Sequence, residues 1–165
     1  MQAPQKRVSI DHPPEASVIA ELGHILLAED SANDVELTLA ALEDHHLANE
    51  VVVVRDGEQA LDYLFARNAF AERPRGNPVL VLLDVKMPKV DGLEVLRQIK
   101  TNDGVRTIPV VMLTSSREEQ DLIRSYQLGV NGYVVKPVGF ADFVAAVRQI
   151  GAFWAVLNEA PPSAT

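Results

Sequence analysis

The sequence predicts an α/β fold, a (βα)5 sandwich in which helices cover both faces of a five-stranded parallel sheet. Short apolar, β-branched runs alternate with segments of helical period, which is typical of βα units around a parallel sheet. The runs are apolar without alternation, as expected of strands covered on both faces. The five expected strands are 25–28, 51–54, 79–83, 110–113 and 133–135.

The helical segments between these runs begin with capping chemistry. At three starts an acceptor side chain is followed three residues later by Glu or Gln, the pattern of a capping box. The pairs are Asp56 with Gln59, Asp91 with Glu94 and Ser116 with Glu119. Residues 67–78 contain two prolines, and we expect a long surface connection there rather than a helix or strand.

Length and composition limit the organisation of the chain. Its 165 residues suit a single hydrophobic core. The polar, Pro-rich segment 1–22 is expected to be a flexible leader, residues 23–150 to form one domain, and residues 151–165 to form a C-terminal helix extension and tail. These boundaries are predictions from pattern and composition alone.

Composition also excludes several classes of function. The chain has no cysteine, which excludes disulfides, thiolate metal sites and cysteine nucleophiles. A net charge of −8 without a basic run disfavours direct binding to nucleic acid. We expect that no apolar stretch approaches the roughly 18 residues of a membrane span, and the N-terminus lacks a signal-peptide core. We therefore expect a cytoplasmic protein with no membrane partner.

The chemistry is concentrated where strands end. In an open α/β sheet, side chains that converge on a ligand come from the carboxyl ends of the strands. The expected first strand is followed by Glu29 and Asp30, the third by Asp84, the fourth by Thr114 and the fifth by Lys136. Three carboxylates, a hydroxyl and an ammonium group should therefore face one crevice.

Electrostatics narrows what this crevice can bind. Two like charges about 4 Å apart repel by about 4 kcal/mol at an effective dielectric near 20, so three ionised carboxylates need cations. Lys136 supplies one positive charge, and a divalent ion would supply two; oxygen donors suit Mg²⁺ better than Zn²⁺. Asp84 is then the best-placed nucleophile for attack on phosphorus. Thr114 and Lys136 would each hold a phosphoryl oxygen.

Four segments carry a resemblance to a known family. They are ILLAED at 25–30, LLDVKMPKVDG at 82–92, VMLTSS at 111–116 and GYVVKP at 132–137. In order and spacing they resemble the receiver domain of two-component response regulators, over about residues 23–150. The resemblance implies a flavodoxin-like sheet with strand order 2-1-3-4-5.

The same resemblance implies a set of roles for individual residues. A sensor histidine kinase would phosphorylate Asp84, and Mg²⁺ would be bound by Glu29, Asp30, Asp84 and the backbone carbonyl of Lys86. Thr114 and Tyr133 would form a switch pair. The resemblance also implies a cis peptide bond between Lys136 and Pro137.

A narrower resemblance concerns the connection over 67–78 and the segment FWAVL at 153–157. Both are similar to the small receivers that serve bacterial and cyanobacterial phytochromes, which implies a phytochrome as the kinase. We expect a stand-alone response regulator, because the chain leaves no room for a DNA-binding output domain. We expect it not to be an enzyme beyond its own phosphoryl transfer and hydrolysis. Its output would be a protein contact through the face of the fourth helix, fifth strand and fifth helix.

One apolar pattern continues past the expected end of the domain. Phe143, Val147, Ile150, Trp154 and Leu157 recur at spacings of 4, 3, 4 and 3. Core packing with a tail folded back over the domain is one explanation. We favour a homodimer seam, because Trp and Leu at an exposed helix end would otherwise leave an apolar patch in water.

Other functions fit the sequence less well. A flavodoxin-like cofactor carrier needs a Ser/Thr/Gly phosphate loop where this chain has Glu29 and Asp30, and an aspartyl phosphatase would want an acid where Lys86 stands. A P-loop hydrolase needs a glycine-rich loop ending in Lys, which the sequence lacks. The remaining alternative is a receiver-shaped interaction module that is never phosphorylated, and the presence of every required side chain counts against it.

Overall fold

The structure is a computed structural model that describes residues 23–43, 50–74, 76–137, 139–159 and 161–162. Five parallel strands form one sheet in the order β2-β1-β3-β4-β5, which confirms the predicted fold and strand order. The leader expected over 1–22 lies outside the described residues. The strands are β1 (Ile25–Ala28), β2 (Val51–Val54), β3 (Leu80–Leu83), β4 (Val110–Thr114) and β5 (Gly132–Val135).

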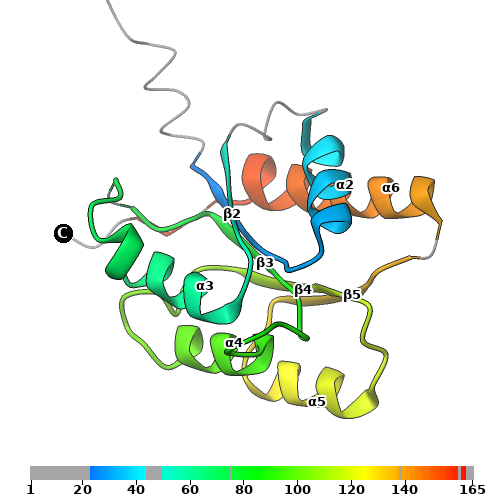
Figure 1. The fold of residues 1–165 in the computed structure, drawn as a ribbon. Helices are drawn as coiled ribbons and strands as arrows, with labels where there is room; N and C mark the ends of the chain where they lie inside the picture. The colour runs from blue at the N-terminus through cyan, green and yellow to red at the C-terminus, as the bar shows by residue number, and fades with distance from the viewer. Residues whose placement is uncertain (1–22, 44–49, 75, 138, 160, 163–165) are drawn as a thin grey trace, which may run out of the picture.

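Helices cover both faces of the sheet (Figure 1). On one face α2 (Ala32–Glu43) lies beside α6 (Phe140–Gly151). The other face carries α3 (Gly57–Leu64), α4 (Gly92–Lys100) and α5 (Glu119–Gln127). This three-layer arrangement explains why the strands are apolar along their whole length.

The core is divided by the sheet into two clusters. In β1, Leu26 and Ala28 pack toward one cluster, and Ile25 and Leu27 pack toward the other. Successive side chains of a strand point to opposite faces, so both faces of β1 need apolar residues. The strands β1, β3 and β4 are buried throughout, which places their carboxyl ends at the centre of one sheet edge.

Two of the three predicted capping pairs form as expected. The Gln59 backbone N–H donates to Asp56 Oδ1 at 2.8 Å, and the Glu94 backbone N–H donates to Asp91 Oδ1 at 2.9 Å. Each bond satisfies a donor that the first turn of a helix leaves open. Both helices therefore begin where the sequence predicted.

The third predicted cap is wrong. Helix α5 begins after Glu118, which caps it without a side-chain hydrogen bond. The Ser116 hydroxyl instead donates to Asp121 Oδ2 at 2.6 Å. The Ser116 oxygen also accepts the Glu118 backbone N–H at 3.4 Å, so Ser116 closes a turn just before the helix instead of capping its first turn.

The long connection after α3 also differs from its prediction. It contains a 3-10 helix, η3 (Asn68–Phe70), where no element was expected. Arg73 anchors the connection by donating from Nε to the Tyr63 carbonyl at 2.6 Å, and its guanidinium lies 4.4 Å from the centre of the Tyr63 ring. These contacts of the Arg73 guanidinium hold the connection against Tyr63 of α3.

The C-terminal helix continues past residue 150 as one long apolar stretch. Helix α6 continues into the π-helix η4 (Ala152–Leu157). Together they give an 18-residue stretch, Phe140–Leu157, with a mean hydropathy of 1.4. By length and composition alone it could cross a membrane, so the expectation that no stretch approaches that length is wrong. Such a helix is weak evidence for a span, because core helices share these properties, and Phe143 and Val147 are buried against the sheet.

The predicted dimer seam is divided by this packing. Phe143 and Val147 belong to the core, and Ile150 and Trp154 are half-buried against it. Leu157 is 72% exposed. The regular spacing therefore combines core contacts of α6 with an exposed apolar end in η4, and only that end is open to another molecule.

Candidate functional site

Backbone pairing brings the strand ends together. Ala28 of β1 pairs with Leu83 of β3, so the residues that follow them, Glu29 and Asp84, leave the sheet side by side. The Asp84 backbone N–H donates to the Ala28 carbonyl at 3.2 Å. On the other side of β4, the Lys136 backbone N–H donates to the Thr114 carbonyl at 2.8 Å.

The Lys136 ammonium lies among three carboxylates. Its Nζ is 2.5 Å from Glu29 Oε1, 2.7 Å from Asp34 Oδ2 and 3.3 Å from Asp84 Oδ2. The side chains of Lys136, Glu29 and Asp84 are each at most 8% exposed, whereas that of Asp34 is 27% exposed. The structure thus gathers three of the predicted site residues and adds Asp34, which the sequence analysis missed.

Asp34 was missed because only strand ends were considered. It lies in the first turn of α2, the helix that follows Glu29 and Asp30. An acidic residue there is often explained by the helix dipole. The available signal was the lysine that follows β5, because a buried ammonium group pairs with acidic side chains.

Glu29, Asp30 and Asp84 are arranged to hold a cation. Each offers a carboxylate oxygen, and these oxygens all lie within 4.8 Å of one another. Asp84 Oδ1 is buried and accepts no hydrogen bond from any residue that the structure describes. A buried oxygen without a partner is unfavourable, and a divalent cation with oxygen ligands would satisfy it. The predicted acidic cluster therefore fits a metal such as Mg²⁺.

The charges of the site shift the pKa values of its groups. Burial raises the pKa of Glu29 to about 7, opposed by the hydrogen bond from Lys136 and reinforced by the charge of Asp84. Burial disfavours the charged form of Lys136, but its hydrogen bonds to Asp34 and Glu29 outweigh burial and raise its pKa. Lys136 is therefore charged at neutral pH, while Glu29 is close to its point of half-protonation.

Thr114 and Tyr133, the predicted switch pair, both contact Ser116. Thr114 is buried, and its Oγ1 accepts the Ser116 backbone N–H at 3.1 Å. The half-buried Tyr133 donates its hydroxyl to the Ser116 carbonyl at 3.1 Å. One peptide segment after β4 thus connects the two side chains.

Asp121 extends this connection to α5 and was also missed by the sequence analysis. It is buried, and besides the Ser116 hydroxyl it has Lys86 Nζ at 3.7 Å. Lys86 Nζ also lies 3.4 Å from Glu118 Oε1. The Lys86 side chain therefore points to the start of α5, which leaves only its backbone carbonyl for the metal role that the resemblance implied.

Comparison with known proteins agrees with this geometry. The family model of the response regulator receiver domain matches residues 25–148. The chain belongs to this family. A receiver domain is the phosphoryl acceptor of a two-component system, so the function expected from the sequence is confirmed at that level.

Two relatives of this receiver domain are covered over most of their own length. It is 42% identical over 137 residues to the probable methanogenesis regulatory protein FilR2 of Methanothrix harundinacea, covering 83% of this chain and 86% of that protein. It is also 42% identical over 130 residues to the response regulator Rcp1 of Synechocystis, covering 79% and 87%.

Solved structures show the same fold. The bacteriophytochrome response regulator AtBRR is 63% identical, with a TM-score of 0.66 over 83% of this chain and 98% of that one. The Mn²⁺-bound form of Rcp1 has a TM-score of 0.79 at 38% identity over 85% and 99%. The receiver domain is thus similar to response regulators of phytochrome systems.

One implied feature of the site is wrong. No peptide bond in the described part of this receiver domain is cis, so the bond between Lys136 and Pro137 is trans. The trans form of an X–Pro bond is favoured by about 0.5–1 kcal/mol unless packing requires cis. Lys136 reaches Glu29 and Asp84 from the trans backbone, so these contacts do not require the cis bond.

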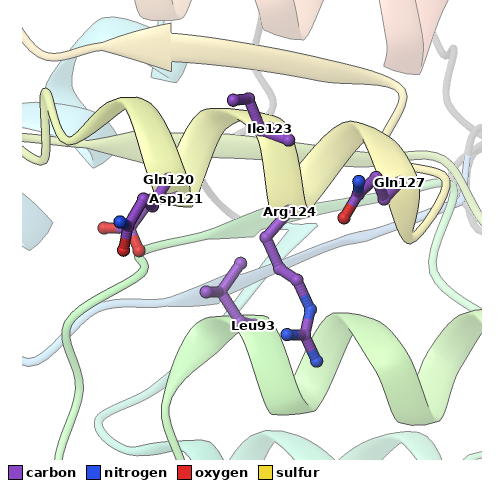
Figure 2. A pocket seen from close by; sticks show the side chains of 6 residues that line it. All are labelled: Leu93, Gln120, Asp121, Ile123, Arg124 and Gln127. Atoms are coloured by element: carbon purple, nitrogen blue, oxygen red, sulfur yellow. The ribbon is translucent and has the colours of Figure 1, made fainter.

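Helix α5 presents an exposed surface beside the site. Leu122, Ile123 and Tyr126 are among the large apolar side chains that remain exposed. A groove of about 290 Å³ lies between α5 and α4. Figure 2 shows Arg124 reaching from α5 toward α4 beside Leu93. Because Asp121 lies in the first turn of the same helix and lines the groove, this surface is connected to the site.

Proposed function

We propose that this receiver domain accepts a phosphoryl group from a phosphohistidine of a sensor histidine kinase onto Asp84. The observation that carries the proposal is the state of the Asp84 carboxylate: one buried oxygen has no hydrogen-bond partner among the described residues, and the other lies 3.3 Å from Lys136 Nζ. A bond forms between an Asp84 oxygen and phosphorus as the phosphorus–nitrogen bond breaks. The leaving imidazole nitrogen keeps the electron pair and takes a proton from solvent.

Mg²⁺ is the cofactor that the site favours in this proposal. Glu29, Asp30, Asp84 and the backbone carbonyl of Lys86 would hold it, and the Mn²⁺-bound form of the relative Rcp1 supports a divalent ion at such a site. Bound Mg²⁺ neutralises carboxylate charge and attracts the incoming phosphoryl oxygens. Lys136 then neutralises one further phosphoryl oxygen.

The signal leaves the site through Thr114 and Tyr133 in this proposal. Thr114 turns its hydroxyl toward the phosphoryl group, which weakens its bond to Ser116, and Tyr133 moves inward. Such a change is a shift between two populations. The exposed apolar side chains of α5 support an output by protein contact over the face of α5, β5 and α6.

The kinase partner in this proposal is a phytochrome. The 63% identity to AtBRR, a bacteriophytochrome response regulator, and the 38% identity to the cyanobacterial phytochrome response regulator RcpA support it. Both partners would meet in the cytoplasm, and the receiver would catalyse only its own phosphorylation and dephosphorylation. No role for nucleic acid or membrane is proposed.

Two copies of the chain would associate through the end of the C-terminal helix. The exposed Phe153, Val156 and Leu157 support this homodimer, with Trp154 at the edge of the seam. Sedimentation over a micromolar concentration series should show a dimer that Leu157→Glu dissociates. A protein that stays monomeric throughout would contradict it.

The experiment that tests the phosphoacceptor compares two acidic side chains. The wild type and Asp84→Asn are incubated with Mg²⁺ and a radiolabelled phosphohistidine donor. Label on the wild type should be stable in acid and labile to hydroxylamine, as expected of an acyl phosphate, and Asp84→Asn should carry none. Asp103→Asn is the matched control, because Asp103 is almost fully exposed. Full labelling of Asp84→Asn would assign the nucleophile elsewhere.

A further inference from the structure

We propose that Asp34 is a positioning residue that holds Lys136 toward α2 in the resting protein and competes with the phosphoryl group for it. The inference rests on the phosphoryl transfer to Asp84 proposed above, and it concerns how readily Lys136 becomes available. It predicts that phosphorylation requires one specific ion pair to open.

The distances around Lys136 show where its ammonium is held. It lies 2.7 Å from Asp34 Oδ2 but 3.3 Å from Asp84 Oδ2. The ammonium has three protons, and its shortest contacts go to Glu29 and Asp34 rather than to the proposed acceptor. Lys136 must therefore shift to become a full partner of a phosphoryl group on Asp84.

The main chain of Asp34 cannot readily follow that shift. Its backbone N–H donates to Ser31 Oγ at 3.3 Å, and its carbonyl accepts the hydroxyl of the buried Thr38 at 2.7 Å. Asp34 is thus fixed at the start of α2. When Lys136 moves toward Asp84, the ion pair with Asp34 lengthens or opens.

A metal ion does not remove this competition. The carboxylates grouped within reach of one ion are those of Glu29, Asp30 and Asp84, and Asp34 is outside that group. A cation bound there offsets the charge of its own ligands, while Asp34 keeps Lys136 as its direct counter-charge. The competition is therefore expected in both the metal-free and the metal-bound protein.

Partial exposure makes the ion pair reversible. The Asp34 side chain is 27% exposed, and Asp34 and Lys136 are among the residues that line a cavity of about 360 Å³. Water in this cavity can solvate Asp34 when Lys136 leaves. The pair thus restrains Lys136 by the modest amount typical of a partly solvated ion pair.

The test uses beryllofluoride with Mg²⁺ as a stable analogue of the phosphoryl group. Its affinity is measured by NMR titration for wild type, Asp34→Asn, Asp34→Glu and Glu36→Gln. Glu36 is the matched control, because it is an exposed acid two residues further along α2 and its substitution changes the charge equally. Urea unfolding of each variant confirms that it is folded.

Asp34→Asn should bind beryllofluoride about two- to fivefold more tightly than wild type, the range for a partly solvated ion pair. Asp34→Glu and Glu36→Gln should stay close to wild type. A second measurement needs no metal: the Lys136 ammonium protons should exchange with solvent faster in Asp34→Asn than in Glu36→Gln, because they lose an acceptor.

The outcomes separate this inference from the proposed function. A wild type that does not bind beryllofluoride with Mg²⁺ overturns both. Equal gains in beryllofluoride affinity for Asp34→Asn and Glu36→Gln would show a general charge effect. Weaker binding by Asp34→Asn would show that Asp34 prepares Lys136 for the phosphoryl group. Either result overturns the proposed competition and leaves the proposed function standing. If Asp34→Asn does not fold, normal binding and exchange in Asp34→Glu supports the inference, and tighter binding there overturns it.

Discussion

Replacing Lys136 by Met should destabilise the metal-free protein more than any other single loss of a surface or site lysine. Methionine keeps most of the apolar part of the lysine side chain but removes its positive charge. The Lys136 Nζ lies 2.5, 2.7 and 3.3 Å from carboxylate oxygens of Glu29, Asp34 and Asp84. Glu29 and Asp84 are almost completely buried, so water cannot replace the lost ammonium.

The size of the effect follows from that burial. Removing one partner of a buried ion pair lowers the free energy of unfolding by about 3–5 kcal/mol, because a buried charge is left without compensation. Glu29 can relieve part of this by taking a proton, since its pKa is already raised to about 7 by burial. The loss should therefore be smaller at pH 5 than at pH 8.

Urea unfolding followed by circular dichroism in EDTA measures the difference. Lys86→Met is the matched control, because the Lys86 side chain is 61% exposed and its nearest carboxylate oxygen, in Glu118, is 3.4 Å away. An exposed pair of this kind contributes at most about 1 kcal/mol. Adding Mg²⁺ at about 100 times its dissociation constant should return about 2.7 kcal/mol to Lys136→Met.

The reasoning is refuted if Lys136→Met in EDTA loses no more stability than Lys86→Met. That result would mean that the cluster around Lys136 is solvated or protonated in solution, and that its charges do not depend on the ammonium. An unchanged loss between pH 5 and pH 8 would separately contradict the role given to Glu29.

Three further predictions concern pH, backbone packing and the switch. The pKa of Glu29 is about 7 in the folded protein, against an ordinary value of 4.5, so the folded state binds more protons than the unfolded state between these pH values. The free energy of unfolding measured in EDTA should therefore fall as pH rises from 4.5 to about 7. Mg²⁺ should remove this fall. A Cβ on Gly92 would overlap the backbone carbonyl of Asp84, so Gly92→Ala should lower the free energy of unfolding by about 1–3 kcal/mol. Gly104→Ala is the control and should lose little, because its added atom meets only a side chain. Equal losses in the two variants would contradict the close approach at Gly92. Thr114→Ala should take up phosphoryl label but show smaller amide shifts in α5 on phosphorylation, and unaltered shifts would remove Thr114 from the switch.

The sequence alone predicted the fold because its signals are local. Runs such as Leu80–Leu83 identify strands covered on both faces, and acceptors such as Asp56 and Asp91 mark helix starts that the structure retains. Parallel strands direct their carboxyl ends to one edge. The convergence of Glu29 and Asp84 with Lys136 followed from these strand ends without any knowledge of distances.

Only the tertiary structure decided which of the possible contacts form. It placed Lys136 closer to Asp34 than to Asp84, turned the Ser116 hydroxyl from a helix cap to Asp121, and left the bond before Pro137 trans. The choice made by Lys136 is between partners far apart in the chain, and the difference between 2.7 and 3.3 Å that distinguishes them depends on strand register and side-chain packing. Local patterns determine which groups reach the edge of the sheet, whereas packing between the segments determines which of them meet.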